Sequence, residues 1–169
     1  MAILVETKTN CSSMSKIIFF CHETDEAVET KLKKHLATYK DFDFYSNLTP
    51  IIGEDILNIK AELTLAHVVV VVLSVDFMYD SFLSKLWKRA VIKKNETEIV
   101  QVLARSVLLE NIIISGITTI PDTPLSTHKD PDAAYIFVVQ IIIDKVEIAL
   151  LKKKIRDLEN ILNITKSKD

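Results

Sequence analysis

The sequence predicts an α/β protein of the small doubly wound class, with a parallel sheet of four or five strands between two layers of helices. Short apolar runs alternate along the chain with stretches whose apolar residues have helical spacing. The run at 66–73, AHVVVVVL, is largely β-branched, which is typical of a central strand covered on both faces. Right-handed crossovers between successive strands then make the sheet parallel.

Two pairs of a strand and a helix are predicted before this central strand. Residues 16–21 form a short apolar run with polar flanks, which favours a buried strand. Residues 23–39 have an acidic first turn and a basic last turn, so they are predicted as a helix aligned with its dipole. A strand over 42–45 and a helix over 54–65 follow, separated by a loop that contains a proline and a glycine.

The elements after the central strand are predicted in the same way. Residues 80–95 have one broad apolar face and outward lysines, which indicates a helix, and 97–104 form a further strand. Several prolines make the next stretch irregular, with a short helix and a short edge strand near 123–126. One long helix is predicted from Pro131, a favoured first helical residue, to about residue 166.

Composition limits the function. The net charge of −2 gives no basic field that would attract nucleic acid or an anionic membrane. The chain has only two glycines, which excludes the glycine-rich loops that cradle phosphates. No apolar run approaches the ~20 residues that span a bilayer. We therefore expect a cytoplasmic protein with two reduced cysteines, no nucleic-acid partner and no membrane contact.

Three parts are predicted along the chain: a loose leader at 1–15, one domain at 16–150 and a helical extension at 151–169. The last part of the long helix has apolar residues spaced 3, 4, 3 and 4, the a/d pattern of a short coiled coil. Two interpretations remain open, because this stripe can pack on its own sheet or bind a second helix. Its residues are Ile148, Leu151, Ile155, Leu158 and Leu162.

Four segments stand out in order along the chain: KIIFFCHETDE at 16–26, PIIGEDI at 50–56, AHVVVVVLSVDFMYDSF at 66–82 and TTIPDTPLSTHKDPDAAYIFVVQII at 118–142. Together they resemble a bacterial-type Toll/interleukin-1 receptor (TIR) domain over roughly residues 16–144. The resemblance implies a flavodoxin-like fold and a role in immune or cell-death signalling. Some members of this family cleave NAD with a glutamate on the third helix, and others only assemble with further TIR domains.

The position of that glutamate is occupied by Leu86 when Ser74 and Phe77 are used to align the motif. A leucine cannot stabilise a developing oxocarbenium ion or orient a ribose hydroxyl. Asp80 stands where the family has a loop serine, and as the residue before a helix it is predicted to be an N-cap. We therefore expect no catalytic residue here.

Two further departures from the family pattern remove polar groups from the expected pocket. A Ser-Tyr-Ser-like run at the end of the first strand is replaced by Phe20, Cys21 and His22, and a Trp-x-Asp motif after the second strand is replaced by a run that starts at Tyr45. Cys21 and His22 could form a nucleophile and base, but a cysteine at the end of a buried strand is more often inert. The four histidines have no metal-ligand spacing, so no metal site is expected.

The sequence thus predicts a TIR-like domain that acts by association with itself or with other TIR-like domains. No cofactor is required, and NAD or a related nucleotide is a possible ligand. The alternative is an NAD glycohydrolase or cyclase that recruits another acid, with Glu54 or Glu62 as candidates. The candidate nucleotide pocket comprises Cys21, His22, Tyr45, Gly53, Glu54, Ser74, Asp80 and Trp87, and the candidate assembly surface comprises Pro50, Ile51, Ile52, Leu151, Ile155 and Leu158.

Overall fold

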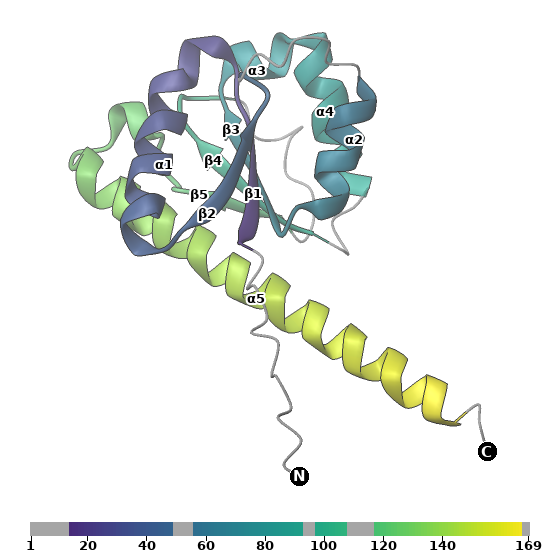
Figure 1. The fold of residues 1–169 in the computed structure, drawn as a ribbon. Helices are drawn as coiled ribbons and strands as arrows, with labels where there is room; N and C mark the ends of the chain where they lie inside the picture. The colour runs from purple at the N-terminus through teal and green to yellow at the C-terminus, as the bar shows by residue number, and fades with distance from the viewer. Residues whose placement is uncertain (1–13, 49–55, 93–96, 108–116, 167–169) are drawn as a thin grey trace.

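Five parallel strands form the centre of the protein in a computed structural model that describes residues 14–48, 56–92, 97–107 and 117–166. The order of the strands in the sheet is β2-β1-β3-β4-β5, and every pairing is parallel (Figure 1). This is the predicted α/β architecture, and it is flavodoxin-like. The strands are β1 (Ser15–Phe20), β2 (Phe42–Ser46), β3 (Val68–Leu73), β4 (Glu98–Leu103) and β5 (Thr118–Ile120).

Helices cover both faces of this sheet. Figure 1 shows α1 and α5 on one side and α2 and α4 on the other, with the short helix α3 at the end of β3. The alternation of strands and helices predicted from the sequence is confirmed. The helices are η1 (Glu23–Asp25), α1 (Glu26–Tyr39), α2 (Ile56–Leu65), α3 (Val75–Tyr79), α4 (Ser81–Ile92), η3 (Leu125–Thr127) and α5 (Pro131–Lys166).

The central strand β3 is buried on both faces, as its β-branched sequence predicts. All six of its residues are 0% exposed. Val68 and Val70 belong to the apolar cluster with α1 and α5, whereas Val69 and Val71 belong to the cluster with α2 and α4. Each fully buried valine stabilises the fold by roughly 1.5–3 kcal/mol relative to an exposed one. The core is therefore two apolar layers, one on each face of the sheet.

The long helix α5 has two parts with different surroundings. Val138, Ile142 and Val146 are buried against the sheet. Residues 151–164 are all exposed, and this part of the helix extends away from the domain (Figure 1). Within the described residues, no helix is both long and apolar enough to cross a membrane.

The prediction of an edge strand near residues 123–126 is wrong. The edge strand is β5, at Thr118–Ile120, and the predicted segment contains the short helix η3 instead. Pro124 has no N–H for a strand ladder, and its carbonyl accepts a hydrogen bond from the N–H of Thr127 at 3.0 Å. A short helix is also predicted in the same proline-containing stretch, without a set position, and η3 is a short helix there.

Two local features also differ from the prediction. Val75–Tyr79 forms the short helix α3, where the sequence pattern predicts no helix. Phe82 belongs to the broad apolar face predicted for residues 80–95, but it is 41% exposed. It lies in the first turn of α4, where it lines a shallow surface hollow and does not pack on the sheet. Strand β1 begins at Ser15, one residue before the predicted start of the domain.

The two parts of α5 predict different effects for one substitution. Ile142→Ala removes a side chain that is 0% exposed and should lower the free energy of unfolding by about 2–5 kcal/mol. Ile155→Ala, on the same helix but 55% exposed, should change it by less than about 0.5 kcal/mol. Urea unfolding of both variants at low protein concentration measures this, and equal losses would contradict the placement of α5.

Candidate functional site

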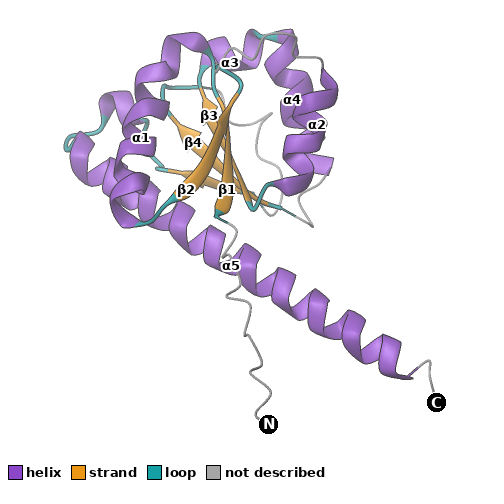
Figure 2. Cartoon of the chain, viewed as in Figure 1, coloured by secondary structure: helices purple, strands orange, loops and turns teal. Residues whose placement is uncertain are grey.

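The loops that follow β1, β3 and β4 meet at the carboxyl edge of the sheet, where doubly wound folds bind their ligands (Figure 2). The loop after β3 starts with Ser74, which is fully buried. Its hydroxyl oxygen accepts a hydrogen bond from the N–H of Phe77 at 3.2 Å and caps α3. This cap turns the chain sharply at the end of β3 and places Asp76 at the edge.

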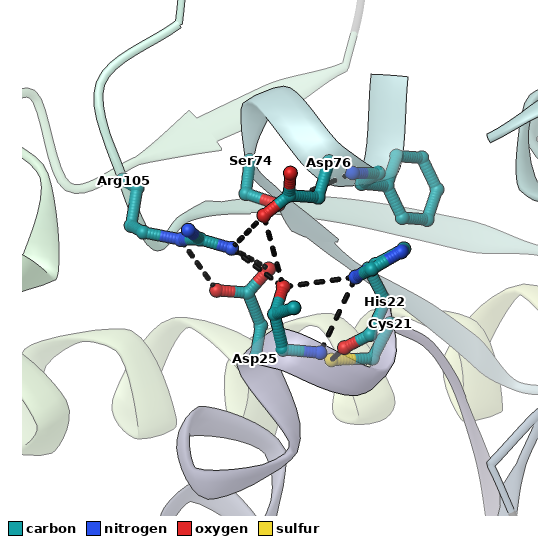
Figure 3. Close-up of polar contacts among 8 residues, drawn as sticks. Cys21, His22, Asp25, Ser74, Asp76 and Arg105 are labelled. Carbon is teal, nitrogen blue, oxygen red and sulfur yellow. Dashed lines mark hydrogen bonds and ion pairs between the residues drawn. The ribbon is translucent and has the colours of Figure 1, made fainter. Parts of the chain in front are cut away.

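A cluster of polar side chains joins these loops. Arg105, just after β4, donates two hydrogen bonds to Asp25, from Nε at 2.8 Å and from Nη2 at 3.0 Å (Figure 3). The same Nη2 contacts Asp76 Oδ2 and Thr24 Oγ1, both at 2.6 Å. Thr24 also donates to Asp76 at 3.0 Å. We call Thr24, Asp25, Asp76 and Arg105 the Arg105 cluster, which links three loops that are distant in sequence.

The hydrogen bonds of the Arg105 cluster shift the pKa values of Arg105 and Asp76. Hydrogen bonds with Asp25 and then Asp76 raise the pKa of Arg105 above its ordinary value. The hydrogen bond from Arg105, followed by that from Thr24, lowers the pKa of the Asp76 carboxyl. Asp25 is only 3% exposed, so its carboxylate depends on this bidentate partner. Arg105 therefore joins Asp25 and Asp76 through one guanidinium group.

Cys21 and His22 follow β1 and have structural contacts. The Nδ1 of His22 accepts a hydrogen bond from the N–H of Thr24 at 3.2 Å and caps η1. The Cys21 side chain is 0% exposed, and its Sγ donates to the carbonyl oxygen of His22 at 3.2 Å. Burial, and then the charge of Glu29, raises the pKa of the Cys21 thiol. A protonated, buried thiol is a poor nucleophile.

Asn47 stands where the family pattern has an acid, and it joins the ends of two strands. Its Oδ1 accepts from the N–H of Cys21 at 2.7 Å, and its Nδ2 donates to the carbonyl oxygen of Cys21 at 2.9 Å. Both hydrogen-bonding groups of this amide are therefore used by the backbone after β1.

The predicted pocket residues separate into three groups. Cys21, His22 and Asp80 line one shallow hollow of about 290 Å³ at the carboxyl edge. Ser74, Tyr45 and Trp87 are buried, and Tyr45 and Trp87 pack in one apolar cluster instead of lining a pocket. Gly53 and Glu54 lie outside the described residues, as do Pro50, Ile51 and Ile52 of the predicted assembly surface.

The position that the resemblance assigns to a catalytic glutamate lies inside the core. Leu86 is 1% exposed and packs in the same apolar cluster as Phe77 and Trp87. Asp80, just before the start of α4, accepts hydrogen bonds from the N–H groups of Phe82 at 2.8 Å and Leu83 at 2.9 Å. The prediction of an N-cap at Asp80 is confirmed.

The alternative acid Glu62 lies at the opposite edge of the sheet. It forms an ion pair with Lys16, which also contacts Asp43 at 3.1 Å. Burial alone would lower the pKa of Lys16, but the hydrogen bonds with Glu62 and Asp43 outweigh it and raise the pKa. Because Lys16 is near the start of β1, Glu62 is at the amino edge and cannot reach the hollow near His22.

Sequence reasoning missed the Arg105 cluster. Arg105 and Asp76 were not singled out, and Asp25 was interpreted only as an acid of a first helical turn. The available signal was that each residue follows a strand whose carboxyl end meets the same edge. Within the described parts of the chain, no group of three or more histidine, cysteine or acidic side chains is arranged to hold a metal ion.

Comparison with known proteins adds no family assignment. No model of a protein family matches the chain, and no curated protein matches its sequence at a significant level.

The Arg105 cluster predicts a loss of stability when its cation is removed. Arg105→Met leaves the buried Asp25 carboxylate without its partner and should lower the free energy of unfolding by about 1–3 kcal/mol. The matched control Arg156→Met, at an exposed position, should change it by less than about 0.5 kcal/mol. Urea unfolding at neutral pH measures both variants, and equal stabilities would show that the contact of Arg105 with Asp25 does not stabilise the fold.

The lowered pKa of Asp76 predicts a pH dependence. Its pKa is lower in the folded protein than in the unfolded chain, where it is about 3.9. Stabilisation by the ionised carboxylate is therefore complete well above pH 4 and is lost as the pH falls through the folded value. The urea midpoints of the wild type and Asp76→Asn should differ at pH 6 and converge in acid. A difference that stays constant down to the acid transition would refute this.

Proposed function

We propose that this chain is a TIR-like signalling domain that acts by protein–protein association and not by cleaving NAD. The observation that carries the proposal is the burial of Leu86. The resemblance puts a glutamate at this position, whereas Leu86 is 1% exposed within an apolar cluster. An apolar side chain in the core supplies neither charge nor a hydrogen bond to a reacting glycosidic bond.

Three of the carboxylates at the carboxyl edge have structural partners. Asp25 and Asp76 bind Arg105, and Asp80 caps α4. A carboxylate that assists glycosidic cleavage needs lone pairs directed toward the substrate. The lone pairs of Asp25, Asp76 and Asp80 are instead directed toward hydrogen-bond donors of the protein itself. The edge has polar groups, but their contacts support a fixed arrangement of loops.

The projecting part of α5 supplies a surface for association. Leu151, Ile155 and Leu158 are each more than half exposed on one helix. Exposed apolar side chains that gather on one face are typical of a protein-binding surface. A role in immune or cell-death signalling follows from the TIR resemblance, and the expected partners are other TIR-like domains or a second copy of the chain.

An NAD assay tests this proposal. Purified chain at high concentration is incubated with NAD, and released nicotinamide is measured by chromatography beside an active NAD nucleosidase. We expect no release above the protein-free sample, because the position of the acid is apolar. The variant Glu54→Ala is the matched check. Turnover by the wild type that survives substitution of Leu86 and disappears in Glu54→Ala would establish the enzyme instead.

A further inference from the structure

The projecting part of α5 has an apolar outer face that points away from its own domain. A residue advances about 100° around an α-helix, so Ile155, nine positions after the buried Val146, lies on the opposite side of the helix. Leu151 and Leu158 lie on the same side as Ile155. They are 61%, 55% and 53% exposed in chain order. We call Ile148, Leu151, Ile155, Leu158 and Leu162 the outer stripe.

Up to Asn160, the inner face of the same segment is polar. Lys153, Arg156 and Asn160 line a hollow of about 360 Å³ between the helix and the amino edge of the sheet, together with His67. Polar side chains toward the domain and apolar ones away from it are the reverse of what packing on the domain requires. Of the two interpretations left open by the sequence, packing of the stripe on its own sheet is therefore not observed.

The residue types of the outer stripe favour one kind of partner. Ile148 and Ile155 occupy a positions of a heptad repeat, and Leu151 and Leu158 occupy d positions. Isoleucine at a with leucine at d favours parallel two-stranded coiled coils. We propose that the outer stripe binds the same stripe of a second copy as a parallel, in-register, two-stranded coiled coil. This inference rests on the proposed function and specifies its partner and geometry.

The charges beside the stripe complement each other in this arrangement. Lys154 is at a g position and Glu159 at the following e position, so in a parallel pair each Lys154 meets Glu159 of the second copy. In an antiparallel pair, Lys154 would instead face the apolar side chain of Ile161. Both charged side chains are exposed. Exposed ion pairs set orientation more than affinity.

The preceding pair of charged positions has a competing contact. Glu147 and Lys152 are also related as g and e, but Lys152 already pairs with Glu98, as does Lys145. Burial alone would raise the pKa of Glu98, but hydrogen bonds from the two lysines outweigh it and lower the pKa. Lys152 therefore fixes the start of the projecting segment to β4, and Lys154 with Glu159 determines the pairing.

The length of the stripe sets the strength of the association. Fifteen residues from Ile148 to Leu162 span about 22 Å of helix, or two heptads. Such a short coiled coil dimerises weakly, so the fraction of dimer depends on local protein concentration. A parallel pair also brings the two domains to the same end of the coiled coil, which suits a domain that signals when copies are brought together.

Sedimentation equilibrium of the full chain over a range of concentrations tests the surface. The wild type should show a monomer–dimer equilibrium, and Leu158→Asp should raise the dissociation constant about tenfold or more, because it places two charges in the seam. Asn163→Asp adds the same charge at a b position outside the seam and should change it by less than about twofold. Unchanged unfolding midpoints check that both variants fold.

Charge exchange tests the orientation. Lys154→Glu alone and Glu159→Lys alone should each weaken the dimer by roughly two- to fivefold at low salt, and the double variant should recover it. An antiparallel pair would not recover, because Glu159 would then face Lys152. A monomer at every concentration, or a dimer indifferent to Leu158→Asp, would overturn this inference. Neither result bears on NAD cleavage, which the nicotinamide assay of the proposed function tests separately.

Discussion

The burial of β3 on both faces is the constraint on which the rest of the structure depends. A strand with six fully buried residues needs an apolar cover above and below, and α1 with α5 supplies one while α2 with α4 supplies the other. Parallel pairing then brings the ends of β1, β3 and β4 to a single edge. The Arg105 cluster, Asn47 and Asp80 therefore lie together at the carboxyl edge, whereas Lys16 and Glu62 lie at the amino edge.

At this edge the polar side chains hold the loops together. Arg105 joins two acidic loops, Asn47 joins the ends of β1 and β2, and Asp80 fixes the start of α4. The contact with Arg105 satisfies the buried Asp25 carboxylate, which burial would otherwise leave unpaired, and this stabilises the fold. The same edge that serves ligand chemistry in many doubly wound proteins is here largely occupied by contacts within the chain.

The strongest sequence signals predicted the fold, because they depend on local pattern. The β-branched run of β3, the proline at the start of α5 and the aspartate before α4 each act within a few residues of themselves. The Arg105 cluster depends on side-chain directions across three loops, which periodicity does not encode. The edge strand was misplaced because a three-residue strand, Thr118–Ile120, has no detectable period.

The helix α5 connects the fold to the proposed function, because one half covers the sheet and the other continues with its apolar face outward. Cross-linking through Leu162→Cys, in a chain that also carries Cys11→Ser, tests the central claim most directly. In a parallel, in-register pair the two residues at position 162 lie side by side at the seam, so mild oxidation should give a disulfide-linked dimer. A chain that remains monomeric under these conditions would contradict the account.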